Sequence, residues 1–447
     1  MKPYPTLGIL YISAYLKSKG YAVRIFDSTF QSRDSFCRFI DSERPSIVGI
    51  YVNLMTKLNA LRLIQHCKSR GCTVVVGGPE IPYYGEEFIL HGADVGVIGE
   101  GELTLEELIP HLQSHGPTGM AHIPGIIYRE SDGNIVRTPE RALIPDLDAM
   151  PNPDREAIDI RKYIDTWRTY HNMGSVSLIC ARGCPYTCTW CSRSVFGDTH
   201  RRRSPAHVVD EIEMLIATYR PDMLWFADDV FTINHRWFYK FYDEMMRRGI
   251  RIPFECISRA DRLNEDILRK MAELGSFRIW FGSESGSQRI LDAMQRRVKV
   301  DQIRAITALA RQFGIEAGLF VMLGYSGEEI KDIDATIQHL VDSDPSTYLT
   351  TVAYPIKGTT FYNEVQDRLI VPNSWETMTD RTLDFHGRPS KRFYWFATRH
   401  MVNEVRYRKL RNNDSAKTAE MISSFTKSKV ARIGMVLTEG LRRFSNA

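Results

Sequence analysis

Cysteine, net charge and long apolar runs are all scarce in this 447-residue chain. It has eight cysteines, a formal net charge of +4, and no apolar run near the roughly 18 residues that a membrane-spanning helix needs. The N-terminus, MKPYPTLGIL, lacks the charged-then-apolar layout of a signal peptide. The small charge gives no general affinity for nucleic acid. We therefore expect a cytoplasmic protein of about two to four domains that binds no nucleic acid.

Half of the cysteines stand together in ICARGCPYTCTWCSRS, residues 179–194. In a reducing compartment, clustered cysteines indicate metal binding or catalysis. The spacing Cys184-x3-Cys188-x2-Cys191 supplies three thiolates, one fewer than a closed zinc site needs. Three sulfur ligands fit a 4Fe–4S cluster with one iron left open to a small molecule, and Trp190 is placed to screen such a cluster from water.

A zinc knuckle with Cys180 as fourth ligand is the alternative interpretation of this segment. Zinc spacings usually pair two short cysteine or histidine arms, and no second arm occurs here. Because Cys180 ends an apolar strand pattern, we interpret it as a packing residue. The scattered cysteines are interpreted as small buried apolar residues: Cys37, Cys67, Cys72 and Cys256.

Residues 1–115 alternate helical and strand patterns. The expected strands are AVRIFD, SIVGIYVN, TVVVGGPE and DVGVIGEGE, with helices at LGILYISAYLKSKG, before Glu43, and at NALRLIQHCKSRG. This predicts a doubly wound, Rossmann-like parallel α/β domain, whose ligands bind at the carboxyl ends of the strands, where the GGPE and GEGE turns lie. The chain opens in a helix rather than a central strand, so we expect either a truncated N-terminus or a sheet that closes in another way.

Three further regions follow. Residues 116–170 form a linker, with a hairpin around Asp132-Gly133 and then a Pro-rich stretch. Residues 171–358 repeat strand and helix six times, with strands VSLIC, MLWFA, PFECIS, FRIWFGSE, EAGLFVML and YLTTVAYP. Six units predict a partial, TIM-like (βα)6 barrel with the cysteine cluster in the loop after its first strand. Residues 359–447 form a mixed C-terminal extension that we assign to the substrate or a lid.

With these motifs the chain resembles the radical S-adenosylmethionine superfamily, in its cobalamin-binding branch. The cysteine trio opens a series that follows the order seen in that branch: FADDVFTIN, Ser258-Arg259, GSESG, GYSGE and YPIKGT. The N-terminal PTLGILYISAYL, GGPE and GEGE resemble the cobalamin domain of that branch. The resemblance includes methyltransferases and the anaerobic magnesium-protoporphyrin ester cyclase type.

The resemblance implies a set of cofactor contacts. Three cysteines, Cys184, Cys188 and Cys191, hold the catalytic 4Fe–4S cluster. The contacts implied for S-adenosylmethionine are Trp190, Asp228, Asp229, Ser258, Arg259, Ser283, Glu284, Met322, Gly324 and Tyr354. The contacts implied for cobalamin are Thr6, Gly8, Asn53, Gly77, Gly78, Glu80, Gly99, Glu100, Gly101 and Glu102. No Asp-x-His-x-x-Gly motif occurs, so a histidine ligand below cobalt is not expected.

The implied reaction begins with reductive cleavage of S-adenosylmethionine to a 5′-deoxyadenosyl radical, which abstracts hydrogen from an unactivated carbon. The first interpretation is methylation of a small-molecule or lipid-like substrate, with electrons from a donor such as flavodoxin or ferredoxin. The second is ring formation or rearrangement with the same cofactors. A zinc-stabilised binding module is the non-enzymatic alternative.

Two basic segments carry open alternatives. The run Arg201-Arg202-Arg203 either meets an anionic cofactor or substrate, or forms a solvated face over the cluster loop. The segment KVARIGMVLTEGLRRF has the pattern of a basic amphipathic helix. We favour ordinary packing of its apolar side over peripheral membrane contact. That apolar side consists of Val430, Ile433, Leu437 and Leu441.

Overall fold

The computed structural model describes residues 3–412 and 418–445, which divide into two compact units. The first unit comprises Met1–Tyr186, Ser192–Asp229 and Val371–Thr382. The second comprises Thr187–Cys191, Val230–Ile370 and Leu383–Ala447. No helix among the described residues is long and apolar enough to cross a membrane.

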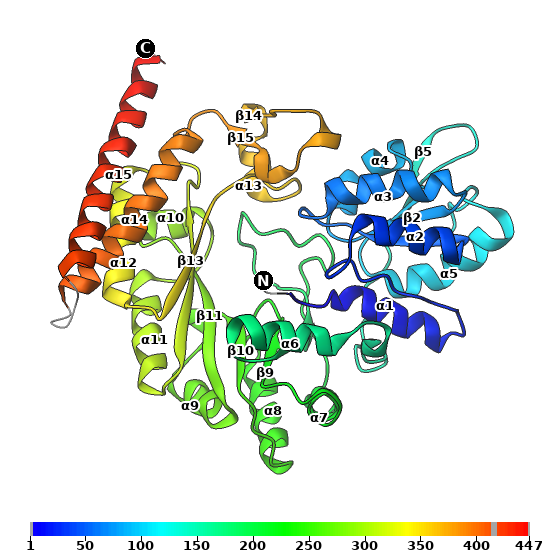
Figure 1. Ribbon diagram of the computed structural model, residues 1–447, viewed down its shortest axis with the longest axis horizontal. Coiled ribbons are helices and arrows are strands. Elements are labelled where there is room, and N and C mark those ends of the chain that lie inside the picture. Colours follow the sequence, from blue (N-terminus) through cyan, green and yellow to red (C-terminus); the bar gives the residue numbers. More distant parts are fainter. Residues whose placement is uncertain (1–2, 413–417, 446–447) are drawn as a thin grey trace. The chain divides into compact units, whose positions relative to one another are not determined.

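Among its described residues the first unit contains seven α-helices and nine strands. Several of them are labelled in Figure 1. The helices are α1 Leu7–Ser18, α2 Arg33–Glu43, α3 Lys57–Ser69, α4 Ile81–Leu90, α5 Gly101–His115, α6 Ile160–His171 and α7 Pro205–Tyr219. The strands are β1 Ile47–Tyr51, β2 Thr73–Gly77, β3 Val95–Val97, β4 Ile126–Arg129, β5 Ile135–Arg137, β6 Ser175–Leu178, β7 Ala181–Arg182, β8 Arg201–Arg202 and β9 Met223–Phe226.

The N-terminal sheet has the strand order β1-β2-β3-β4-β5. Strands β1, β2 and β3 are parallel, as predicted. Along β2, Val74 and Val76 pack with α2, α3 and α4, whereas Val75 points to the other face and packs with α5. Helices therefore cover both faces, which confirms the doubly wound, Rossmann-like arrangement.

The predicted strand AVRIFD does not form. Residues 21–27 are irregular, and β1 is an edge strand. The apolar side chains of this segment pack on a helix and do not join a sheet. Phe26, for example, contacts the rings of Phe36 and Phe39. The Asp27 carboxylate accepts a hydrogen bond from the Tyr163 hydroxyl at 2.8 Å.

The predicted hairpin around Asp132-Gly133 does form, as strands β4 and β5. Strand β4 also pairs antiparallel with β3, so the hairpin extends the N-terminal sheet. Such an antiparallel edge on a parallel sheet is common.

The second unit contains the remaining helices and strands. The strands are β10 Phe254–Ser258, β11 Ser276–Glu284, β12 Glu316–Leu323, β13 Thr347–Val352, β14 Leu369–Ile370 and β15 Asp384–Phe385. The helices are α8 His235–Arg247, α9 Glu265–Leu274, α10 Gln288–Ala293, α11 Val300–Gln312, α12 Ile330–Ser343, α13 Thr360–Val365, α14 Lys391–Arg411 and α15 Thr418–Ser445.

All six strands predicted for the barrel are present. In the first unit β6 pairs in parallel with β9, and in the second unit β10, β11, β12 and β13 pair in parallel in that order. Two of the helices that follow these strands begin at side-chain caps. Ser204 accepts from the His207 backbone NH at the start of α7, and Asn264 accepts from the Ile267 backbone NH at the start of α9.

The C-terminal helix packs as predicted, but the side of the helix that was predicted to be buried is the wrong one. Helix α15 does pack on α14, but through Ala431 and Met435. Val430, Ile433 and Leu437 are instead exposed, at 61%, 59% and 62%. The side chain of Leu441 lies outside the described residues.

Candidate functional site

A cavity of about 530 Å³ lies within the first unit, at the carboxyl ends of the N-terminal strands. Its walls combine glycine backbone with apolar side chains such as Ile50, Val76 and Val97. Nine of the ten residues predicted to contact cobalamin line it: Thr6, Gly8, Asn53, Gly77, Gly78, Gly99, Glu100, Gly101 and Glu102. These walls fit a large, largely apolar ring system such as cobalamin.

Only glycine fits at position 78 in the cavity wall. Its φ is +117°, and a Cβ atom there would lie 2.4 Å from the Val52 carbonyl oxygen. The β1 and β2 ends are joined just there, because the Val52 NH donates to the Gly77 carbonyl at 2.7 Å. Glycine therefore lets the turn after β2 sit close to β1.

Glu80 is the one predicted cobalamin residue that does not line the cavity. It is buried at the start of α4, where burial, with Asp380 adding to it and Lys57 opposing it, raises the pKa of its carboxyl to about 7. Lys57 donates to the carbonyls of Trp375 and Met378 at 2.7 and 2.9 Å. Glu80 thus belongs to a buried contact between α4 and the Val371–Thr382 segment.

The side chains of the GEGE turn bind arginines. Arg182 donates to Glu100 and to Glu102, each at 2.6 Å, and Arg201 donates to the other oxygen of Glu100 at 2.7 Å. All four side chains are at least largely buried. Arg182 precedes Cys184 by two residues, so this ion network joins the cavity wall to the base of the cysteine loop.

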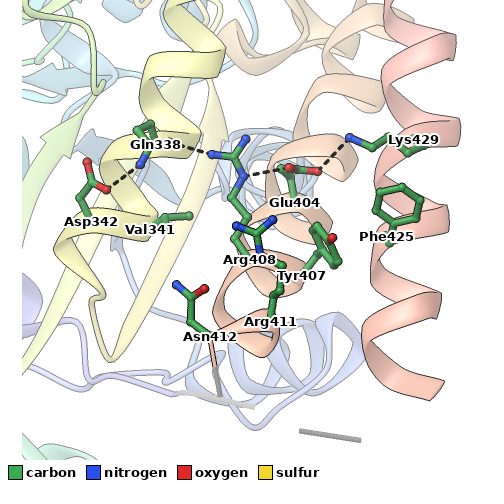
Figure 2. A pocket seen from close by; sticks show the side chains of 10 residues that line it. All are labelled: Gln338, Val341, Asp342, Glu404, Tyr407, Arg408, Arg411, Asn412, Phe425 and Lys429. Carbon is green, nitrogen blue, oxygen red and sulfur yellow. Dashed lines mark hydrogen bonds and ion pairs between the residues drawn. The ribbon is translucent and has the colours of Figure 1, made fainter. Parts of the chain in front are cut away.

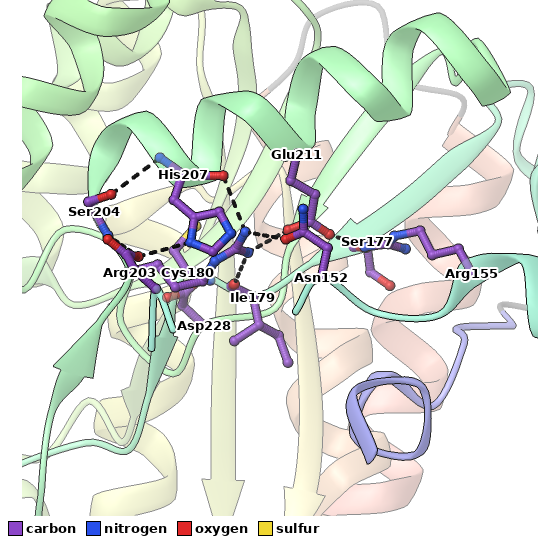
Figure 3. Close-up of polar contacts among 11 residues, drawn as sticks. Asn152, Arg155, Ser177, Ile179, Cys180, Arg203, Ser204, His207, Glu211 and Asp228 are labelled. Carbon is purple, nitrogen blue, oxygen red and sulfur yellow. Dashed lines mark hydrogen bonds and ion pairs between the residues drawn. The ribbon is translucent and has the colours of Figure 1, made fainter. Parts of the chain in front are cut away.

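A second buried network continues from the same loop (Figure 3). The Glu211 carboxylate accepts hydrogen bonds from the Arg155 guanidinium, at 2.7 Å, and from the Arg203 guanidinium. The Arg203 backbone NH donates to the Cys180 carbonyl at 2.9 Å. The Arg201-Arg202-Arg203 run is therefore neither a solvated face nor an open anion site. Each of the three arginines forms an ion pair inside the first unit.

Cys180 is fully buried in the first unit, and burial, followed by the nearby Asp228 charge, raises the pKa of its thiol well above the usual range. A metal ligand must be a thiolate, so this surrounding disfavours Cys180 as a ligand. The interpretation of Cys180 as a packing residue is confirmed. Of the scattered cysteines, Cys67, Cys72 and Cys256 are buried as predicted, whereas Cys37 is only partly buried.

The three clustered cysteines lie on both units. Cys184 belongs to the first unit. Gly183 beside it has φ +87°, and a Cβ atom there would lie 2.3 Å from the Thr199 carbonyl oxygen. Cys188 and Cys191 belong to the second. In the part of the chain that the structure describes, no three His, Cys, Asp or Glu side chains converge in a metal-binding group.

The sulfur of Cys188 faces two cationic side chains. Arg296 donates to it at 3.4 Å and Arg259 at 3.9 Å. Arg296 also lies 2.7 Å from Glu284. Two guanidinium groups at one sulfur place positive charge beside it, and so fit a negatively charged iron–sulfur cluster at this cysteine.

The two aspartates after β9 differ in their surroundings. Asp228 is buried and accepts from the Cys180 NH at 3.1 Å and from Arg202 at 3.2 Å, and burial raises the pKa of its carboxyl. The alternative of a solvated loop carboxylate is therefore wrong for Asp228. Asp229 is exposed at the end of the first unit.

The other residues implied for S-adenosylmethionine lie in the second unit. Ser258 bonds the Thr232 hydroxyl at 2.5 Å, and Ser283 bonds His339 at 2.8 Å. Glu284 has φ +33° at a break in the β11–β12 register, and burial raises the pKa of its carboxyl. These buried polar groups stand at or near the carboxyl ends of β10 and β11, the end at which barrels of this type carry chemistry.

The last four of these residues are Trp190 of the cysteine loop and three residues at the ends of β12 and β13. Trp190 and Met322 belong to one apolar cluster with Tyr325 and Phe361. The Gly324 NH donates to Glu328 at 2.6 Å, with Gly324 at φ +81°. Tyr354 follows β13 and is partly buried.

Sequence reasoning missed two arginines that the structure places at the cysteines. Arg182 stands inside the quoted cysteine segment, so its position beside Gly183 was an available signal. Arg296 is more than a hundred residues from Cys188 and had no signal in the sequence.

A second cavity, of about 590 Å³, lies in the second unit between α12, α14 and α15 (Figure 2). Its polar walls include the chain of contacts from Gln338 through Arg408 and Glu404 to Lys429. None of the predicted site residues is among the described residues that line it.

Comparison with known proteins assigns both halves of the site. The B12 binding domain family matches residues 2–109, and the radical SAM superfamily matches residues 178–340. An uncharacterized methyltransferase of Pyrococcus horikoshii is 28% identical over 84% of this chain and 82% of its own. The anaerobic magnesium-protoporphyrin IX monomethyl ester cyclase of Rubrivivax gelatinosus is 27% identical over 82% of this chain and 67% of its own.

The solved structure of OxsB, a cobalamin-dependent S-adenosylmethionine radical enzyme, has the same fold, with a TM-score of 0.75 and 17% identity over 98% of this chain and 78% of that chain. A radical SAM domain implies a 4Fe–4S cluster and S-adenosylmethionine, and a B12 binding domain implies cobalamin. The chain is therefore a radical SAM enzyme and belongs to the branch of that superfamily that carries a B12-binding domain.

Proposed function

We propose that this chain is a cobalamin-dependent methyltransferase that acts on an unactivated carbon of a small-molecule or lipid-like substrate. The proposal depends on one observation in the first unit, namely that the wall of the cavity leads directly into the cysteine segment. The glycine-lined cavity there includes Arg182, which precedes Cys184, the first cysteine of the Cys-x3-Cys-x2-Cys segment, by two residues. A methyl carrier and a radical source next to each other are what methylation of an inert carbon requires.

When bound, the cluster and S-adenosylmethionine supply the 5′-deoxyadenosyl radical, and cobalamin carries the methyl group. The residues of the chain bind and orient these groups. We assign cluster binding to Cys184, Cys188 and Cys191, with Arg296 and Arg259 as hydrogen-bond donors to the Cys188 sulfur.

The remaining residues exclude water and hold the cofactors still. The apolar walls of the first-unit cavity keep water from the carrier. Ser258, Ser283 and Glu284 are buried polar groups that we assign to S-adenosylmethionine. Residues 359–447 are assigned to the substrate side, and a flavodoxin or ferredoxin to the supply of electrons.

A second candidate is ring formation or rearrangement. It is favoured by the 27% identity to the Rubrivivax gelatinosus cyclase over most of this chain. Both candidates use the same cofactors and the same cavity, so the products must distinguish them.

The test is anaerobic turnover with methyl-labelled S-adenosylmethionine. Methylation predicts S-adenosylhomocysteine together with 5′-deoxyadenosine, and label in the product. 5′-Deoxyadenosine alone favours ring formation. A reconstituted protein that cleaves no S-adenosylmethionine contradicts both candidates, and a single zinc ion in place of iron supports the binding module.

A further inference from the structure

The helical hairpin of α14 and α15 closes the C-terminal side of the second unit. Helix α14 packs on α12, and α15 packs on α14 (Figure 1). Ser428 of α15 bonds His400 and Glu404 of α14, at 3.0 and 2.6 Å, and Arg432 pairs with Asp334 of α12. The hairpin is therefore held by its inner face, and its outer face is left to solvent.

The outer face of the hairpin is apolar. On α15 the exposed apolar residues follow helical spacing, and they are Ile422, Phe425, Val430, Ile433, Val436 and Leu437. On α14, Trp395 is 53% exposed and lies under the Arg399 guanidinium, 3.9 Å from its ring centre. An unpaired apolar face of this kind marks an interaction surface rather than a fold requirement.

The hairpin is also strongly cationic. Residues 391–411 and 418–445 contain twelve Lys and Arg against three Glu and no Asp, a net charge of +9, whereas the whole chain carries +4. The rest of the chain is therefore negative by five charges. Exposed members of the set include Lys391, Arg392, Arg399 and Lys427.

We propose that the outer face of the α14–α15 hairpin binds the surface of an anionic lipid bilayer. Apolar side chains at helical spacing with Lys and Arg beside them are the composition of helices that lie in a membrane interface. Each cation near the surface is attracted to anionic headgroups, while the apolar stripe enters the acyl boundary. An arginine over an exposed tryptophan suits the same interface.

The charge of the hairpin also favours an anionic membrane over a second copy of the chain as the partner of this face. Two hairpins of +9 placed face to face would repel each other, so self-association through this face is disfavoured. A nucleic acid would use the cations and leave the apolar stripe in water. Only a surface that is both anionic and apolar satisfies the two features together.

The test is co-sedimentation of the full chain with vesicles of phosphatidylcholine alone and of phosphatidylcholine with phosphatidylglycerol. We expect binding to the anionic vesicles, weakened by salt, and much less to the neutral ones. The double variant Ile433→Ser/Leu437→Ser should bind at least about tenfold more weakly, because both side chains lose apolar burial in the bilayer. Arg399→Gln/Lys427→Gln should weaken binding only to the anionic vesicles.

The matched control is Leu90→Ser/Met246→Ser, which removes two other exposed apolar side chains and should bind as the unchanged chain does. Equal melting temperatures of all variants show that the fold is retained. Binding that is absent, or that the Ile433→Ser/Leu437→Ser variant retains, overturns the proposal. A concentration-dependent dimer in sedimentation velocity that this variant abolishes would assign the face to a second copy instead. The outcome is independent of the reaction proposed above.

Discussion

Arg182 and Glu100 form a buried ion pair, with 2.6 Å between Nη1 and Oε1, that joins the cavity wall to the cysteine loop. Strands β7 and β8 close the base of this loop, with Arg182 on β7 and Arg201 on β8. Both arginines bind Glu100. The position of Glu100 is thereby coupled to the two ends of the loop that carries Cys184.

Replacing Arg182 by Ala should lower the free energy of unfolding by about 3–5 kcal/mol, because Glu100 and Glu102 lose their buried partner. Thermal and denaturant unfolding of the first unit measure this. Arg70→Ala is the matched control, since Arg70 binds Asp41 on the half-exposed surface and should cost less than about 1 kcal/mol. Equal costs for the two variants would contradict the coupling.

The periodicity of apolar residues correctly predicted the strands and helices that bury one face. It failed where an apolar segment packs on a helix and does not pair with a strand. The six strands of the barrel and the α7 and α9 caps follow from local patterns. AVRIFD has the same alternation, yet Phe26 is satisfied by two aromatic rings of α2 and no strand forms. Local sequence does not show whether a neighbouring strand edge is available.

The candidate site divides in the same way. The rule that ligands bind at the carboxyl ends of parallel strands indicates the GGPE and GEGE turns, and the family resemblance implies the other residues of the nine that line the cavity. The ion pairs of Arg182 and Arg201 join residues about eighty to a hundred positions apart, and no spacing in the chain indicates such pairs. Glu80 does not line the cavity because it is buried just before α4, near the charges of Asp380 and Lys57, although Gly78, two residues earlier, lines the cavity.

Cys184→Ala should abolish the cluster, whereas Cys180→Ala should keep it. Cys184 is one of three assigned ligands, while Cys180 is fully buried with a thiol that burial keeps protonated. Iron analysis and absorbance of anaerobically purified protein measure the outcome, with about four irons per chain in the Cys180→Ala variant. Loss of iron in both variants would indicate that Cys180 is also a ligand, as in the zinc-knuckle interpretation.

Arg296→Gln should make the reduction potential of the cluster more negative by on the order of 50 mV. Arg296 donates to the Cys188 sulfur at 3.4 Å, and its positive charge favours the reduced, more negative cluster. A redox titration followed by electron paramagnetic resonance measures the shift. Arg311→Gln, at an exposed arginine of α11, is the control and should leave the potential unchanged. An unchanged potential in Arg296→Gln would place the cluster away from Cys188.

His339 should make the stability of the second unit fall as the pH falls. It is fully buried between Ser283 and Ser343, and burial, with Arg304 adding to it, lowers the pKa of its imidazole to about 4. Below an unfolded pKa of about 6.5 the unfolded chain takes up a proton that the folded chain refuses, so the loss grows as the pH drops toward 4.

Between pH 7.5 and pH 5 this histidine should cost about 2 kcal/mol of unfolding free energy. Urea unfolding of the cluster-free chain across this range measures the slope. His339→Gln should flatten it, because an amide can still bond Ser283 and does not titrate, whereas His115→Gln at an exposed position should leave the slope unchanged. If His339→Gln had the slope of the unchanged chain, His339 would have to be protonated in the folded state, and its bond to Ser283 would then be a donated one. Ser283 would then accept that bond, whereas beside a neutral imidazole the direction of the bond depends on the tautomer.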